Sequence, residues 1–458
     1  MDTITTTATP TAPSSPQQHS PGRLRKSMGM TALVLFGLAY MVPLAVFSAY
    51  GLVAQTTQGH LPTAYLLTLG AMLFTAYSYG RMVQAHPYSG SVYTYTRKAF
   101  GACAGFMAGW TLLLDYIFLP LLSYLLIGIY MSEYFPSIHP WVWVLGSISL
   151  VTFLNLIGIE SVIRVNWILV VAQLAFIVVF VALSFSSVAS QAQPVSLTAP
   201  FYHEGFSVSA IMAGAAVLCL SFVGFDAVST MAEETSDPTR RIPRAIMAVS
   251  LSGGLLFLLV SYFAQLVHPD WSSFANPDSA AVDVMRSAGG QLLANAFTAT
   301  YVAGCFASAM VSQASVSRVL FAMGRDGALP RVLGQLVTNK RVPACAIMLV
   351  ALVSLSALVI SLETVASMIS FGALFAFSMV NLAVTKHYLV DRKLRGAGNC
   401  LRYGLVPGLG LLSTLWLWTS LSSMSFTIGL CWMGVGAIFL LGLTRALRVK
   451  LPELQMAD

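Results

Sequence analysis

Two acidic residues stand in long apolar stretches of the chain. Asp115 lies in "GWTLLLDYIFLP", and Asp226 lies in "SFVGFDAVSTMAEE", at the end of an apolar run that begins near Phe206. An acid at the depth of a membrane helix costs roughly 2.5–3.5 kcal/mol on insertion scales, so such residues usually face a cavity and mark a pathway or a partner. The alternative is that each acid is protonated, or bonded to a neighbouring hydroxyl, and holds helices together.

No basic residue falls near the centre of a predicted span, so the two acids favour a cationic ligand. A carboxylate beside an ammonium group stays ionised. Because Asp115 and Asp226 occupy separate positions, they suit a ligand with a positive charge at each end. Aromatic side chains nearby could face an ammonium group or its methylene chain, although any one of them could equally serve packing. They are Tyr40, Tyr116, Phe118, Phe222 and Phe225.

The composition indicates which elements must position these residues. The chain has 458 residues, of which 57% are hydrophobic and 9% charged, and its mean hydropathy is +0.77. Soluble globular proteins carry roughly 25% charged residues, so most of this chain must face lipid. We expect an all-α polytopic membrane protein with helices of about 20 apolar residues each. Twelve runs qualify: 30–54, 62–80, 104–131, 140–158, 165–186, 206–231, 245–267, 290–315, 343–361, 364–386, 404–421 and 425–443.

The basic residues orient these spans. Twelve crossings place both ends of the chain on one side, and all of the 24 Lys and Arg residues except Arg286 fall on that side. The excess of basic residues in cytoplasmic loops therefore predicts that both termini are cytoplasmic. The net charge of +7 follows from this topology, and a nucleic-acid surface is not needed to explain it.

Few other sequence features predict a site. Residues 1–22 are rich in Ser, Thr, Pro and Gln and are expected to form a disordered tail. The six cysteines stand alone, without CxxC spacing or paired histidines. We therefore expect neither a disulfide framework nor a metal site, and no cofactor.

Two of the predicted spans are interrupted. Gly224 and Asp226 fall inside 206–231, and Pro43 falls inside 30–54, where it removes a backbone donor and frees carbonyls near Ala39 and Tyr40. A broken helix at this depth is tolerated only where it lines a cavity or is buried in protein. The two spans are five apart, a spacing that predicts inverted repeats, about 30–186 and 206–386, with a binding site at the membrane midplane.

Several motifs resemble those of one family of transporters. "SFVGFDAVSTMAEETSDPTRRIPRAI" (221–246) and "ASVSRVLFAMGRDGALP" (314–330) resemble segments of the amino acid–polyamine–organocation superfamily. "LPTAYLLTLGAMLFTAYSYGRMVQAHPYSGSVYTYTRK" (61–98) and "GFMAGWTLLLDYIFLP" (105–120) resemble the bacterial putrescine importers of that superfamily more narrowly. The likeness runs from about residue 23 to residue 445, with the spacing of the helices matched.

The resemblance implies a LeuT-like 5+5 inverted repeat in the inner membrane of a bacterium, and import of putrescine or a similar diamine, with the proton as the coupling ion. It implies a transporter core at 23–403, two further helices at 404–443 and a cytoplasmic tail at 444–458. "AYMVPLA" (39–45) and "FVGFDA" (222–227) match the unwound segments. The candidate substrate-binding residues are Asp226, Asp115, Tyr116, Tyr40, Val42, Pro43, Ala45, Phe222, Gly224 and Phe225.

The chain departs from the family pattern in two places. The 30–54 span lacks the Gly-Ser-Gly-type stretch that cradles a substrate carboxylate in amino acid permeases, which argues for a ligand without a carboxylate. Gln173 stands where some proton-coupled relatives carry a lysine, so their coupling mechanism does not transfer.

Glu233 and Glu234 follow the second interruption, near Arg240, Arg241 and Arg244. They are interpreted either as a surface cluster of ion pairs or as an inner gate or proton acceptor. Arg318, Arg325 and Asp326 are expected to form contacts that hold the gate closed.

Other functional classes remain as alternatives. A channel usually assembles rings of like charge across subunits, and this chain has single acids. The sequence contains no HExxH, GxSxG or phosphate-loop motif that would indicate an enzyme. Among transporters, the alternative is a permease or exchanger for cationic amino acids or other amines.

Overall fold

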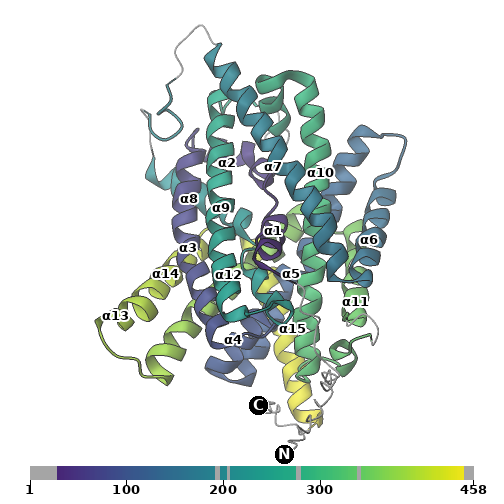
Figure 1. The fold of residues 1–458 in the computed structure, drawn as a ribbon, viewed down its shortest axis with the longest axis vertical. Helices are drawn as coiled ribbons and strands as arrows, with labels where there is room; N and C mark the ends of the chain where they lie inside the picture. The colour runs from purple at the N-terminus through teal and green to yellow at the C-terminus, as the bar shows by residue number, and fades with distance from the viewer. Residues whose placement is uncertain (1–27, 191–195, 204–206, 275–279, 338–341, 448–458) are drawn as a thin grey trace, which may run out of the picture.

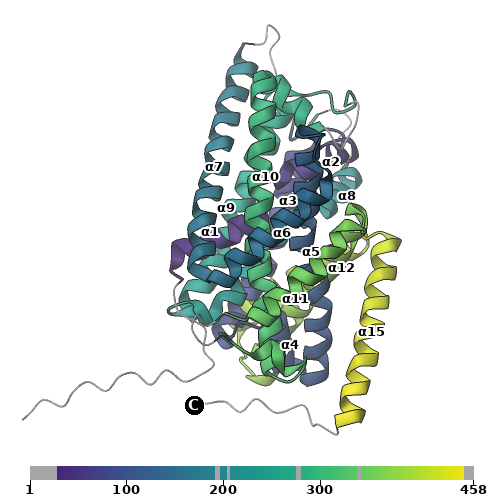
Figure 2. The same cartoon turned by 90° about the vertical axis from the view of Figure 1, so that its right-hand side faces the viewer.

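The computed structural model describes residues 28–190, 196–203, 207–274, 280–337 and 342–447. Within these ranges the chain is helical, and the β-structure is a single bridge between Met28 and Thr235. Figures 1 and 2 show an elongated bundle in which α1 lies near the centre and α15 stands at the edge. The predicted all-α architecture is confirmed.

The first half of the chain contains both interruptions. Its helices are α1 (Met30–Met41), η1 (Ala45–Ser48), α2 (Tyr50–Thr56), α3 (Leu61–Ala85), α4 (Ser91–Phe100), α5 (Ala102–Tyr134), α6 (Pro140–Ile157), α7 (Ile159–Ala189), α8 (Val208–Leu218), η2 (Cys219–Phe222) and η3 (Asp226–Glu234). The predicted span 30–54 is thus divided into α1, η1 and α2, and the predicted span 206–231 into α8, η2 and η3.

The second half consists mainly of longer helices. They are α9 (Pro238–Val267), α10 (Ala280–Arg325), η5 (Arg331–Gly334), α11 (Ala344–Ser354), η6 (Leu355–Leu358), α12 (Leu362–Thr385), the π-helix η7 (Lys386–Asp391), α13 (Ala397–Cys400), the π-helix η8 (Leu401–Leu405), α14 (Val406–Trp418) and α15 (Ser423–Leu447). Non-helical backbone at Gly289 and Gly290 kinks α10.

Eleven segments of the described residues are long and apolar enough to cross a membrane. The predicted span 343–361 corresponds to a shorter apolar segment, Ala344–Leu358. Two predicted ends are wrong: α10 continues past 315 to Arg325, and α15 continues past 443 to Leu447. The expected tail at 1–22 lies outside the described residues.

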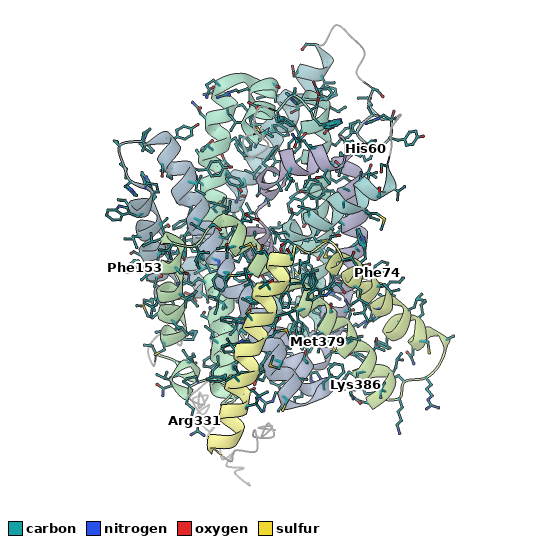
Figure 3. All side chains as sticks on the ribbon, turned by 180° about the vertical axis from the view of Figure 1, so that it is seen from behind. His60, Phe74, Phe153, Arg331, Met379 and Lys386 are labelled. Carbon is teal, nitrogen blue, oxygen red and sulfur yellow. The ribbon has the colours of Figure 1, made fainter. Side chains whose placement is uncertain are left out.

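The two interrupted elements lie inside the bundle. η3 contacts α1, α3, α4, α9 and α10, whereas α15 contacts only α5 and α12 among its more extensive neighbours. Apolar side chains such as Phe153, which is 61% exposed, project from the sides of the bundle (Figure 3). Arg331 and Lys386 lie toward one end and His60 toward the other (Figure 3). The outside is therefore apolar along its length, and the polar side chains of the interior must find partners there.

Candidate binding site between the interrupted helices

The first interruption follows from Pro43. α1 ends at Met41, and Val42 takes φ 53° and ψ 101°, outside the helical region. Pro43 has no N–H to donate to the carbonyl of Ala39. The next carbonyl, that of Tyr40, accepts a hydrogen bond from the Ser308 hydroxyl of α10 at 3.1 Å. The break is thus fixed by a side chain from another helix, as its burial requires.

The second interruption requires a glycine. η2 ends at Phe222, and Gly224 has φ +123°, which residues with a Cβ rarely adopt. A Cβ at this position would lie 2.4 Å from Cδ1 of Tyr40. Gly224 therefore serves both the backbone turn and the close approach of the two interrupted helices.

Asp226 begins η3 and is fully buried. Its Oδ2 accepts hydrogen bonds from the hydroxyl of Tyr116 at 2.7 Å and from that of Tyr79 at 3.4 Å. Its Oδ1 accepts one from the N–H of Gly224 at 3.2 Å. Hydrogen bonds to a carboxylate stabilise its ionised form, and in the described part of the chain no basic side chain accompanies this one.

Asp115 precedes Tyr116 on α5 and is also fully buried. Neither of its carboxyl oxygens has a hydrogen-bond partner among the described residues, and neither does the hydroxyl of Tyr40. The rings of Tyr40 and Tyr116 are 6.1 Å apart, and both acids act electrostatically on Tyr40. Buried polar groups normally have partners, so this cluster holds acceptors and a hydroxyl that a donor-bearing ligand would satisfy.

The predicted aromatic residues divide into two groups. Tyr40 and Tyr116 belong to the acid cluster, and Phe225 lies beside it, edge-on to Tyr79 at 5.8 Å. Phe222 instead packs edge-on against Phe257 of α9 at 5.4 Å. The structure therefore places Phe222 in a helix–helix contact, and we find no contact between it and either acid.

The remaining predicted residues line the first interruption. Pro43 is buried, whereas Val42 and Ala45 are half-buried. Gln173 of α7 is buried, and its Oε1 has no partner among the described residues. A Cβ at Gly304 would lie 2.7 Å from that oxygen and 3.1 Å from Cγ1 of Val42. Gln173 thus stands beside the break in α1.

Sequence reasoning missed Tyr79. It lies on α3, near the end of the apolar run, and its role as a donor to Asp226 depends on how α3 packs against η3. The local sequence "AYSYGR" carries no signal that would single it out.

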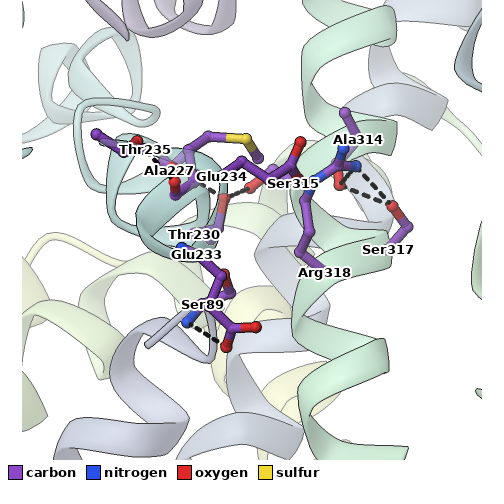
Figure 4. A network of polar contacts seen from close by, with 11 residues as sticks. Ser89, Ala227, Thr230, Glu233, Glu234, Thr235, Ala314, Ser315, Ser317 and Arg318 are labelled. Carbon is purple, nitrogen blue, oxygen red and sulfur yellow. Dashed lines mark hydrogen bonds and ion pairs between the residues drawn. The ribbon is translucent and has the colours of Figure 1, made fainter. Parts of the chain in front are cut away.

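The acids that end η3 pair with α10. Glu234 forms an ion pair with Arg318 at 2.5 Å, and both side chains are at most 3% exposed. Glu233 receives two hydrogen bonds from Arg325, at 3.0 and 2.9 Å, and its Oε1 also accepts from the N–H of Ser89 at 3.3 Å. Figure 4 shows Glu233, Glu234 and Ser89 on one side and Arg318 on the facing helix.

The interpretation of these acids as a surface cluster near Arg240, Arg241 and Arg244 is wrong for Glu234, which is buried. Arg241 bonds instead to Ser236 at 2.5 Å, and Arg240 lies 4.0 Å from Asp237. The cause is the length of α10, which continues to Arg325 and brings two arginines against η3. The expected contact of Asp326 is present: it pairs with Arg97 at 2.6 Å.

The polytopic helical fold and the two interrupted helices around buried acids are features of membrane transporters. A family model described as "Amino acid permease" matches residues 32–440. The chain belongs to this family, and it is a multi-pass membrane protein.

Three relatives show how far the likeness extends. The chain is 37% identical to the low-affinity putrescine importer PlaP of Escherichia coli, over 94% of this chain and 96% of the relative. It is 29% identical to the branched-chain amino acid permease BcaP of Bacillus subtilis, over 91% and 92% of the two chains. It is 26% identical to a vacuolar cationic amino acid transporter of Arabidopsis thaliana, over 80% of this chain and 64% of the relative.

Proposed function

We propose that this chain imports putrescine or a similar small diamine across the inner membrane of a bacterium, by alternating access around Asp226. The observation that carries the proposal is the buried carboxylate of Asp226, held between the two interrupted helices by Tyr116, Tyr79 and Gly224 with no cationic partner in the described part of the chain. The similarity to a relative that bears the name of a putrescine importer supports the choice of substrate.

In this proposal one ammonium group of the diamine binds Asp226. Oδ2 already accepts from two hydroxyls, whereas Oδ1 accepts only from the N–H of Gly224. Each carboxylate oxygen has about two acceptor sites, so Oδ1 is the atom with capacity left. The second ammonium group reaches Asp115, whose two oxygens lack partners.

The chain crosses the membrane twelve times, with Ala344–Leu358 as the ninth crossing and both termini in the cytoplasm. The distribution of Lys and Arg supports this orientation. Helices 30–186 and 206–386 form the inverted repeats of a LeuT-like fold, and the interruptions at corresponding places in each repeat support that arrangement.

The ion pairs between η3 and α10 keep the cytoplasmic side closed in this proposal. Glu234–Arg318 and Glu233–Arg325 join the interrupted helix to α10, and Arg97–Asp326 joins α4 to the turn after α10. The substrate leaves when these pairs separate.

The membrane potential supplies enough free energy for import. A dication that moves inward across about 100 mV gains roughly 4.6 kcal/mol, twice the value for one charge. This supports a gradient of more than about a thousandfold. Proton coupling is compatible with the site, but the energetics do not require it.

Uptake by proteoliposomes tests the proposal. With an imposed potential, the wild-type protein should accumulate radiolabelled putrescine, and Asp226→Asn should abolish accumulation while leaving expression and monodispersity intact. Asp237→Asn is a matched control, because Asp237 is half-exposed at the start of α9 and has a φ of 55° that asparagine tolerates. Undiminished uptake by Asp226→Asn refutes the assignment.

A transporter for cationic amino acids is the second candidate, favoured by the similarity to the Arabidopsis relative. Competition by putrescine, spermidine, lysine and ornithine separates the two. Stronger inhibition by lysine or ornithine than by putrescine would favour this candidate.

A further inference from the structure

A second cluster of polar and aromatic side chains lies where α3 and α12 end. The π-helices η7 and η8 contact each other there, and Tyr388 stacks on Tyr403 with ring centroids 4.1 Å apart and planes 8° apart. The guanidinium carbon of Arg392 lies 5.8 Å from the ring centroid of Tyr388, and that of Arg81 lies 5.6 Å from the ring centroid of Tyr403. These distances are typical of cation–π contacts.

This basic–aromatic cluster (Arg81, His86, His387, Tyr388, Arg392 and Tyr403) carries an excess of positive charge. Burial, and then the neighbouring His387, Lys98 and Arg392, lower the pKa of His86 to about 4. The nearby acid Asp391 is bound to Lys386 at 2.7 Å. In the described part of the chain, neither Lys98 nor Arg392 has an ion-pair partner.

The cluster also contains donors with nothing to bind. His387 is 8% exposed and lies edge-on to His86, with ring centroids 4.9 Å apart. Nε2 of each imidazole has no hydrogen-bond partner among the described residues. The tautomer that protonates Nε2 makes each ring a donor. Imidazole and guanidinium donors without an acceptor are the groups that bind a phosphate oxyanion.

The surroundings of the cluster point to a lipid phosphate. The apolar helix α12 ends at Thr385, and the cluster begins two residues later, at the level where a span meets the headgroups. Exposed apolar side chains flank it: Val390 is 59% exposed, Leu401 54% and Leu405 55%. A soluble phosphate would have no use for them, whereas the acyl chains of a lipid would cover them.

We propose that the basic–aromatic cluster binds the phosphate of an anionic phospholipid. The guanidinium groups of Arg81 and Arg392 and the imidazoles of His86 and His387 face the phosphate oxygens, and the apolar residues of η7 and η8 contact the acyl chains. The site is separate from the acids of the transport site, so the inference does not depend on the identity of the transported amine.

Lipid titration followed by native mass spectrometry of the purified full-length protein tests this proposal. Phosphatidylglycerol should bind more tightly than phosphatidylcholine, and Arg392→Gln should weaken it by about fivefold, as expected for one charge near a lipid surface. Arg392 is exposed, so its loss does not threaten folding. Arg395→Gln is the matched control, because it removes the same charge from an exposed position three residues away.

Three results would overturn the proposal. Equal weakening by Arg395→Gln would show non-specific attraction to the basic loop. Equal binding of phosphatidylcholine would remove the need for an anionic lipid. Binding of water-soluble glycerol phosphate as tight as that of phosphatidylglycerol would assign the cluster to a free phosphate.

Discussion

The two tyrosine hydroxyls on Asp226 provide a graded test of the site. Tyr116 donates at 2.7 Å and Tyr79 at 3.4 Å to the same oxygen. A hydrogen bond to a charged group contributes roughly 1.5–3 kcal/mol, and a long one contributes much less. Because the ionised form of Asp226 binds the ammonium group, loss of the shorter bond should weaken putrescine binding the more.

We therefore expect Tyr116→Phe to raise the Kd for putrescine by roughly 10- to 150-fold, the range that these free energies give. Tyr79→Phe should raise it by less than about fivefold. Both changes keep the aromatic ring, so the packing of α3 and α5 is preserved. Equilibrium binding of radiolabelled putrescine to the purified protein measures the Kd without contributions from transport rates.

Tyr65→Phe is the matched control. It removes a hydroxyl from the same bundle, where Tyr65 lies 3.4 Å from the Ser221 hydroxyl and away from both acids, and its Kd should equal that of the wild type. An unchanged Kd for Tyr116→Phe, or a larger effect of Tyr79→Phe, would refute the reasoning.

Three further changes address other parts of the account. Asp115→Asn should reduce uptake of diamines more than that of monoamines, because only a diamine has a second ammonium group; equal losses would make Asp115 a structural residue. Glu234→Gln should lower the unfolding temperature in detergent, since breaking a buried ion pair costs about 3–5 kcal/mol, whereas Glu233→Gln, whose arginine partner is 37% exposed, should lower it less; equal shifts would contradict this order. Gly224→Ala should abolish putrescine binding because its Cβ would lie 2.4 Å from Tyr40; wild-type affinity would show that the two helices are not fixed in this contact.

The sequence sufficed for the features that have local causes. Pro43 removes a backbone donor wherever it stands in a helix, and Gly224 beside Asp226 weakens an apolar helix. Both interruptions could therefore be predicted from single residues, and so could the burial of Asp115 and Asp226.

The features that depend on packing could not be predicted. The pairing of Glu234 with Arg318 requires α10 to continue past the apolar run, and the acid facing Arg318 stabilises that continuation. The donor role of Tyr79 depends on the register of α3 against η3, which no local pattern encodes. For the same reason Phe222, which is four residues from Asp226 in sequence, packs on α9.

A structure of the protein with putrescine bound tests the central claim most directly. The account predicts an amine nitrogen about 3 Å from Oδ1 of Asp226, the separation of a charged hydrogen bond, and the other amine toward Asp115. A bound diamine that contacts neither carboxylate, with Asp226 still bonded only to Tyr116, Tyr79 and Gly224, would contradict it.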